Sequence, residues 1–250
     1  MDNFERYIGI DYSGAGKPAD RLSGLRVFVA SVDTEPEEKR NLNDWNWTRH
    51  ILASWVEERL REPIPTLIGI DHAFAFPSAY MERHHLKTWD EFLSDFHEHW
   101  PTDVKSVEEL RKGNARTGET DELRLTEMWT PSAKSVFLFD VPGSVAKSTH
   151  AGLPWLWRIR QAHGHRIHFW PFDGFEVPTG KSVIAEIYPS LFRHRYPHEN
   201  RKPDQQDAFA TCAWLKRVDE NGFLRSYFKP PLLEEECQLA KLEGWILGVV

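Results

Sequence analysis

Acidic side chains follow three short apolar runs of this sequence, and their placement suggests that they meet. Asp11 ends the run 7–10, Asp71 ends the similar run 67–70, and Glu186 ends a third run. Each run has the length and apolar character of a buried strand, so each acid is predicted at the carboxyl end of a strand. Carboxylates gathered at such a place supply the oxygen ligands that hard divalent cations take.

Two further acids open an apolar helix late in the chain. Asp204 and Asp207 are three residues apart, and this spacing puts both carboxylates on one helical face. Pro203 suits the first turn of a helix that we expect to run to about residue 218. A first-turn Asp also stabilises a helix N-terminus without any site, so both roles of Asp204 stay open.

The segments between the first two acids predict a sheet that brings them to one edge. Residues 25–32 favour a second strand, antiparallel to the first because the connection is short. Residues 47–61 carry apolar side chains at helical spacing, and a helix between two strands makes those strands parallel. Residues 33–38 are predicted to be a polar exit loop. Asp11 and Asp71 are therefore expected at the same edge.

The remaining segments predict an α/β fold in a single domain, residues 1–250, with a probable helical insertion at about 78–135 that covers the cleft. A helical pattern over 144–162 is interrupted near Gly152 and Pro154. The other predicted elements are helices at 79–100 and 106–111 and strands at 166–172 and 183–187.

Composition restricts the classes of function. The net charge of −7 gives no general attraction to nucleic acid, although Arg193, Arg195 and Lys202 form a local basic patch near the acids. The two cysteines, Cys212 and Cys237, are far apart, which argues against a disulfide framework or a thiolate zinc site. No run approaches the ~18 apolar residues of a membrane span, so we expect a cytoplasmic protein with no membrane partner.

Taken in chain order, these motifs resemble the ribonuclease H-like superfamily. More closely, four of them resemble the family known as domain of unknown function 429, described as predicted nucleases of that fold. The four motifs are Ile8-Gly9-Ile10-Asp11, Ile68-Gly69-Ile70-Asp71, Ala185-Glu186-Ile187-Tyr188-Pro189 and Asp207-Ala208-Phe209-Ala210. The Asp204–Asp207 spacing is also similar to the Asp-x-x-Asp of RuvC-type Holliday-junction resolvases. The resemblance covers the sheet and the last long helix and leaves residues 78–135 unmatched.

The resemblance implies a nuclease that hydrolyses phosphodiester bonds with two Mg²⁺ or Mn²⁺ ions and has nucleic acid as its partner. Asp11 is then expected to bridge the ions, and Asp71 or Glu186, with Asp207, to complete the ligand shell. The expected catalytic residues are Asp11, Asp71, Glu186 and Asp207, and Asp204 joins them as an expected metal ligand. One ion would activate water and the other would stabilise the leaving oxygen.

Five residues are predicted to contact the substrate: Ser13, His72, Arg193, Arg195 and Lys202. Ser13 could hydrogen-bond a phosphate or serve only as a turn residue, and His72 could assist proton transfer. The clustered histidines lack the HExxH spacing of a zinc site.

Two alternatives remain open. Residues 9–14 also look like the first phosphate loop of sugar kinases and actin-like ATPases, which favours a nucleotide-binding phosphotransferase. Those proteins need a second comparable lobe and a Gly-rich adenosine motif, and neither is found in 250 residues. The other alternative is a catalytically inactive binding module of the same fold.

Overall fold

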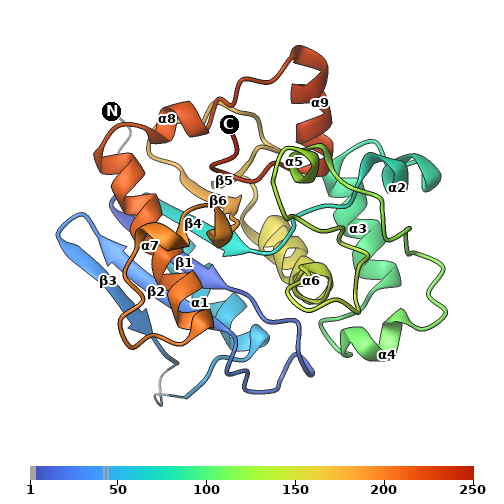
Figure 1. Ribbon diagram of the computed structural model, residues 1–250, viewed down its shortest axis with the longest axis horizontal. Coiled ribbons are helices and arrows are strands. Elements are labelled where there is room, and N and C mark those ends of the chain that lie inside the picture. The colour runs from blue at the N-terminus through green and yellow to red at the C-terminus, as the bar shows by residue number, and fades with distance from the viewer. Residues whose placement is uncertain (1–3, 42, 44) are drawn as a thin grey trace.

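A mixed six-stranded sheet forms the centre of the molecule (Figure 1). The structure is a computed structural model, and it describes residues 4–41, 43 and 45–250. The strand order is β3-β2-β1-β4-β6-β5. The strands are β1 (Arg6–Asp11), β2 (Arg26–Ser31), β3 (Thr34–Lys39), β4 (Thr66–Asp71), β5 (Ile167–Trp170) and β6 (Ser182–Glu186). An α/β fold with flanking helices is thus confirmed.

Helices cover both faces of this sheet, and each face has its own apolar core. Ile8 and Ile10 of β1 face a core shared with α1 (Arg49–Arg61) and α6 (Ala146–His163), whereas Tyr7 faces a core shared with α7 (Pro203–Glu220). The alternation of side chains along a strand produces this division. The other helices are α2 (Ser78–Arg83), α3 (Trp89–His99), α4 (Val107–Arg111), α5 (Leu125–Met128), α8 (Leu224–Tyr227), α9 (Glu234–Glu243) and the short 3₁₀ turns η1 (Pro189–Leu191) and η2 (Arg193–Arg195).

The pairing of β1 places the first two acids in register. β1 runs antiparallel to β2 and parallel to β4, as the sequence predicts, and Asp11 pairs with Asp71. β6 lies parallel to β4 on its other side, where Glu186 pairs with Ile70. The three strand-end acids therefore lie along one edge of the sheet.

Two glycines allow α7 to approach this sheet closely. A Cβ added to Gly9 would lie 2.3 Å from the carbonyl oxygen of Ala208, and one added to Gly69 would lie 2.9 Å from Cγ2 of Thr211. Both distances are shorter than van der Waals contact, so a larger residue in either strand would push α7 outward. The repeated Ile-Gly-Ile-Asp motif thus serves helix packing as well as the placement of acids.

Two predicted boundaries are wrong, each for a physical reason. Residues 34–39, which overlap the expected exit loop 33–38, form the edge strand β3, where Pro36 is tolerated because an edge strand pairs on one side only. Helix α6 continues through Gly152 and Pro154 without interruption. Gly152 is needed there, because a Cβ would lie 2.3 Å from Nε2 of His72, which packs against the helix.

The section 78–135 contributes α2 to α5 and joins the core beneath α1 and α6. The helical pattern over 79–100 is divided into α2 and α3, and Thr88 caps α3 by accepting a hydrogen bond from the N–H of Glu91 (3.2 Å). Phe92 and Phe96 of α3 are fully buried in the same apolar cluster as the strands. No helix in the described part of the chain is long and apolar enough to cross a membrane.

Candidate acidic site

Asp11 and Asp71 are neighbours at the carboxyl edge of the sheet. Their strands are parallel and adjacent, and adjacent strands lie about 4.8 Å apart. Both residues keep part of their surface exposed. In the described part of the chain, neither carboxylate has a hydrogen bond or an ion pair. Two carboxylates are thus held side by side without an ion pair, although Arg26 lies opposite Asp11 in β2 and its charge lowers the pKa of Asp11.

The electrostatics of this pair favour a cation. Burial raises the pKa of Asp11 well above its ordinary value, and the negative charges of Asp71, Asp207 and Asp204 raise it further. Burial also raises the pKa of Asp71, followed by the charges of Asp207 and Glu186. Carboxylates that repel one another in this way are stabilised as anions when a cation lies between them.

Helix α7 brings two more acids to the same edge. Burial raises the pKa of Asp207, and the guanidinium of Arg193 opposes that rise. Nη1 of Arg193, in η2, donates to both carboxylate oxygens of Asp207, at 2.9 and 3.1 Å. Asp204 is exposed one turn earlier. A Cβ on Gly24 would lie 3.4 Å from Oδ2 of Asp204 and 3.4 Å from Oγ of Ser13, so these two side chains flank one point.

Glu186 has a different environment from the other acids. Its side chain is buried, and the fully buried Arg124 donates to its two oxygens at 2.6 and 2.7 Å. Arg124 also donates to Glu127 at 3.0 Å, and the N–H of Phe74 donates to Glu186 at 3.2 Å. The Glu186 carboxylate is therefore already neutralised.

Arg124 is a residue that sequence reasoning missed. It lies 62 positions before Glu186, in the section 78–135, which the sequence predicts to be an insertion that covers the cleft. The one local signal is its spacing of three residues from Glu127, which favours a helical ion pair but says nothing about Glu186.

Arg49 is a second residue that sequence reasoning missed. It is fully buried, and its guanidinium donates to the carbonyl oxygens of Ser13 (3.1 Å), Ala15 (2.8 Å) and Gly16 (3.1 Å). These hydrogen bonds from α1 fix the conformation of the loop that follows Asp11. Gly14 completes the packing, because a Cβ there would lie 2.2 Å from the carbonyl oxygen of Lys147 in α6. An arginine in the first turn of a helix gives no sequence signal for this role.

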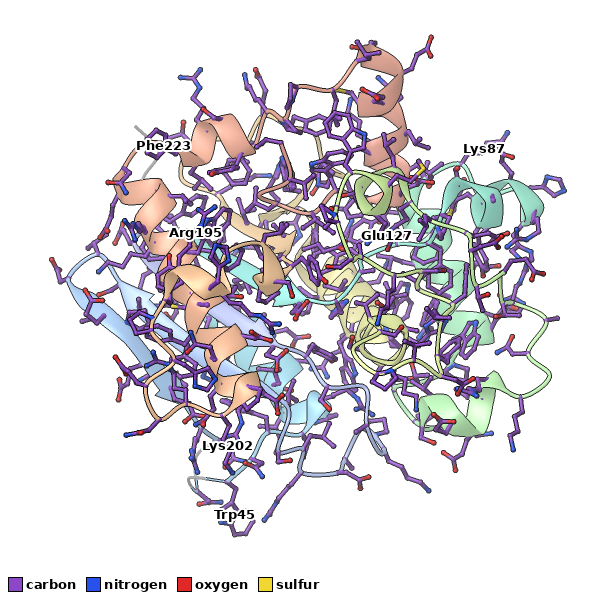
Figure 2. The ribbon with its side chains drawn as sticks, in the orientation of Figure 1. Trp45, Lys87, Glu127, Arg195, Lys202 and Phe223 are labelled. Atoms are coloured by element: carbon purple, nitrogen blue, oxygen red, sulfur yellow. The ribbon has the colours of Figure 1, made fainter. Side chains whose placement is uncertain are left out.

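The remaining predicted substrate contacts are divided between core and surface. His72 is buried, where its ring packs on Tyr12 (4.8 Å between ring centroids) and its Nδ1 lies 2.8 Å from the carbonyl oxygen of Ala73. Burial lowers the pKa of His72 to about 4, so its imidazole is neutral and faces no solvent. Arg195 and Lys202 are exposed on the side of the molecule where α7 lies, across from Glu127 (Figure 2).

The carboxylates at this edge of the sheet are oxygen ligands of the kind that a hard cation binds, but they do not surround a common point. Among the described residues, no three His, Cys, Asp or Glu side chains are arranged so that they could hold a metal ion. Arg193 holds Asp207 and Arg124 holds Glu186, whereas Asp11 and Asp71 form no ion pair among the described residues. Oxygen ligands of this kind suit Mg²⁺ or Mn²⁺.

Comparison of the chain with protein-family models, with curated proteins and with solved structures found no match. The geometry and electrostatics of this edge are therefore the basis for its function.

Proposed function

We propose that the acidic site binds divalent cations, Mg²⁺ or Mn²⁺, and hydrolyses phosphodiester bonds of nucleic acid. The observation that carries the proposal is the in-register pair Asp11 and Asp71, whose pKa values are both raised and which form no ion pair among the described residues. Retaining two repelling carboxylates at one edge lowers stability, and a function that needs a cation there explains them.

The chain's own residues have distinct roles in this proposal. Asp11 and Asp71 are the central ligands, Asp207 joins them from α7, and Asp204 lies at the exposed rim. When bound, two ions would activate a water molecule and stabilise the leaving oxygen. Arg193 could exchange Asp207 for a substrate phosphate, because its side chain is about half exposed (48%).

Glu186 is the predicted ligand that this proposal places outside the coordination shell. Removing its buried carboxylate from Arg124 would leave two opposite charges unpaired, which costs several kcal/mol. We infer that Glu186 orients the edge of the sheet, in particular through the N–H of Phe74.

The strand order supports a ribonuclease H-like fold as part of the proposal. An antiparallel hairpin, β1 and β2, is followed by parallel strands β4 and β6, and a late helix carries further acids. Arg195 and Lys202 supply positive charge near the acids, as a phosphate backbone requires. Membership of domain of unknown function 429 and a cytoplasmic location stay predictions.

The test is cleavage of labelled single-stranded, duplex, hybrid and branched nucleic acids with Mn²⁺. Asp11→Asn and Asp71→Asn should each reduce cleavage about 100-fold or more, because each removes a ligand charge. Asp33→Asn, an exposed acid in the turn before β3, is the matched control and should cleave as the wild type does. Absence of cleavage by the wild type on every substrate would refute the proposal.

One observation favours a second candidate, a nucleotide-binding phosphotransferase. Arg49 donates hydrogen bonds to carbonyl oxygens of the loop 13–16. Within the described residues, the N–H groups of Gly14 and Gly16 donate to no protein acceptor. Free loop N–H groups of this kind can bind phosphate. Hydrolysis or binding of ATP with Mg²⁺ in the same assays, with no cleavage of nucleic acid, would favour this candidate.

A further inference from the structure

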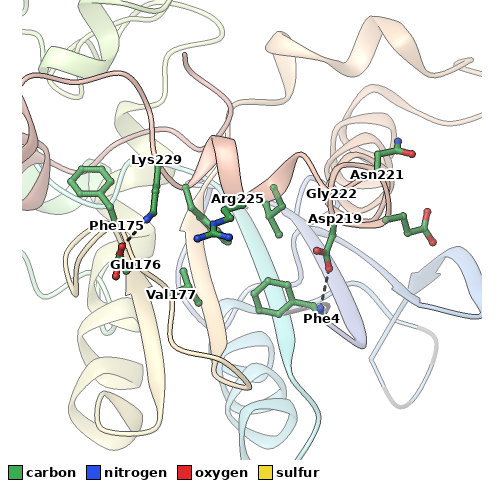
Figure 3. Close-up of a pocket in the computed structure, with 12 residues that line it drawn as sticks. Phe4, Phe175, Glu176, Val177, Asp219, Asn221, Gly222, Arg225 and Lys229 are labelled. Atoms are coloured by element: carbon green, nitrogen blue, oxygen red, sulfur yellow. Dashed lines mark hydrogen bonds and ion pairs between the residues drawn. The ribbon is translucent and has the colours of Figure 1, made fainter. Parts of the chain in front are cut away.

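A hollow of about 590 Å³ lies at the other end of α7 from the acidic site (Figure 3). Asp204 opens α7 and Asp219 lines the hollow, so fifteen residues of helix, about 22 Å, separate the two places. The hollow is therefore independent of the acidic site. Its apolar lining consists of Phe4, Phe175, Val177, Leu224 and Phe228.

The wall of this hollow is held in place by internal hydrogen bonds. Oδ2 of Asp219 accepts from the N–H of Phe4 (2.9 Å), the bond drawn at the right of Figure 3, and from the hydroxyl of Tyr7 (2.8 Å). The chain turns after α7 at Gly222, whose φ of +73° suits glycine, and then enters α8. A ligand would thus find a preformed site, which lowers the entropic cost of binding.

The acids around the hollow have hydrogen-bond or ion-pair partners, whereas one arginine does not. Each acid has a partner: Asp219 is engaged as described, Glu176 pairs with Lys229 at 2.6 Å, and Glu220 pairs with Lys216 at 3.5 Å. Arg225, by contrast, has no hydrogen bond or ion pair in the described part of the chain. In Figure 3 its guanidinium lies between Glu176 and Asp219. The carboxylates have partners, whereas the five donors of Arg225 make no hydrogen bond among the described residues, although its charge acts on Glu176.

We propose that this hollow binds a small, ring-bearing monoanion, such as an aromatic carboxylate. The anionic group would accept hydrogen bonds from Arg225, and the ring would pack on Phe4, Leu224 and Phe228. The volume lies within the range of about 300–1,000 Å³ that small-molecule sites occupy. An anion is favoured over a cation because the free groups are donors.

Two fluorescent probes that differ in one charge test the proposal. Anilinonaphthalene sulfonate carries a ring system and one negative charge, and N-phenylnaphthylamine is its uncharged counterpart. Both should bind the wild type with one site per chain. Arg225→Gln should weaken the sulfonate about fivefold or more and leave the neutral probe unchanged, because it removes only the charged donor.

Three further variants complete the experiment. Val177→Trp fills the hollow and should weaken both probes, whereas Arg166→Gln changes an exposed arginine elsewhere and should weaken neither. Asp11→Asn should also leave both affinities unchanged, which separates this site from the proposed function. Circular dichroism confirms that each variant folds, and Arg225→Gln decides the outcome even if Val177→Trp does not fold.

Either of two results would overturn the proposal. One is equal affinity of the sulfonate for the wild type and for Arg225→Gln. The other is tighter binding of a ring-bearing cation, such as an acridinium dye, than of the sulfonate.

Discussion

The acids at the ends of β1 and β4 and the acid at the end of β6 occupy equivalent places in the sheet, but they differ in their partners. Arg124 neutralises Glu186 through two short hydrogen bonds, whereas Asp11 and Asp71 form no ion pair, and the charges of Arg26 and Arg193 only partly offset the repulsion between the acids. Position at a strand end therefore does not decide what a carboxylate does. The nearby counter-charge decides it.

This difference divides the edge into a part that stabilises the fold and a part that weakens it. A buried acid that is held by a bidentate arginine stabilises the fold only while both partners are present, because either one alone is an unpaired buried charge. Partly buried acids that repel one another lower the stability until a cation binds.

The largest effect is expected from Arg124→Met. It leaves Glu186 and Glu127 buried without a counter-charge, so the free energy of unfolding should fall by about 3–5 kcal/mol in a urea titration. Lys39→Met breaks the exposed pair with Glu37 and should cost less than about 1 kcal/mol. Equal losses in the two variants would contradict the structural role given to Arg124.

Gly9→Ala should have the next largest effect. The added Cβ would collide with backbone atoms of Ala208 and Cys212 in α7, and such overpacking costs about 1–3 kcal/mol. Ala185 of β6 pairs with Gly69 but already carries a Cβ, so Ala185→Gly should cost only about 1 kcal/mol. Urea titrations of both variants make the comparison. An unchanged free energy of unfolding in Gly9→Ala would show that the close approach of α7 to the sheet does not depend on this glycine.

Asp11→Asn should stabilise the protein when no divalent cation is present. The pKa of Asp11 is raised in the folded state, so its ionisation costs stability as the pH rises above about 4 and through the folded pKa. At pH 7 with EDTA, the free energy of unfolding of the variant should exceed that of the wild type by on the order of 1 kcal/mol. This difference should shrink toward pH 4.

Manganese should reverse that order, because it binds the folded wild type and stabilises it by mass action. Thermal melts of wild type and Asp11→Asn, each with EDTA and with Mn²⁺, provide the measurement. A wild type that remains less stable than the variant at saturating Mn²⁺ would argue against a cation at this edge.

The smallest effect is expected from Arg193→Gln. Its guanidinium competes with a metal ion for Asp207, and an exposed ion pair is worth at most about 1 kcal/mol, so Mn²⁺ should bind about threefold more tightly without it. Electron paramagnetic resonance of free Mn²⁺ measures the affinity. Arg195→Gln is the control, and a change of the same size in that variant would mean that net charge alone sets the affinity.

Much of the scaffold could be predicted from the sequence, because its strands and helices follow from local patterns of apolar residues. The apolar runs before Asp11 and Asp71, the helix between them and the apolar face of α7 all depend on periodicities of two or 3.6 residues. The parallel pairing that puts the two acids side by side follows from the helical crossover. Errors arose where a local signal opposed the final structure, as with Pro36 in β3 and Pro154 in α6.

The sequence by itself determined five of the six strands, the order of the acids and their expected common edge. Only the tertiary structure decided which acids remain without a partner. Arg124 reaches Glu186 across 62 residues, and Arg49 reaches the loop after Asp11 across more than thirty, and neither contact leaves a periodic signal. An ion pair of this kind forms wherever packing brings two charges together, so it depends on the whole fold and cannot be derived from local spacing.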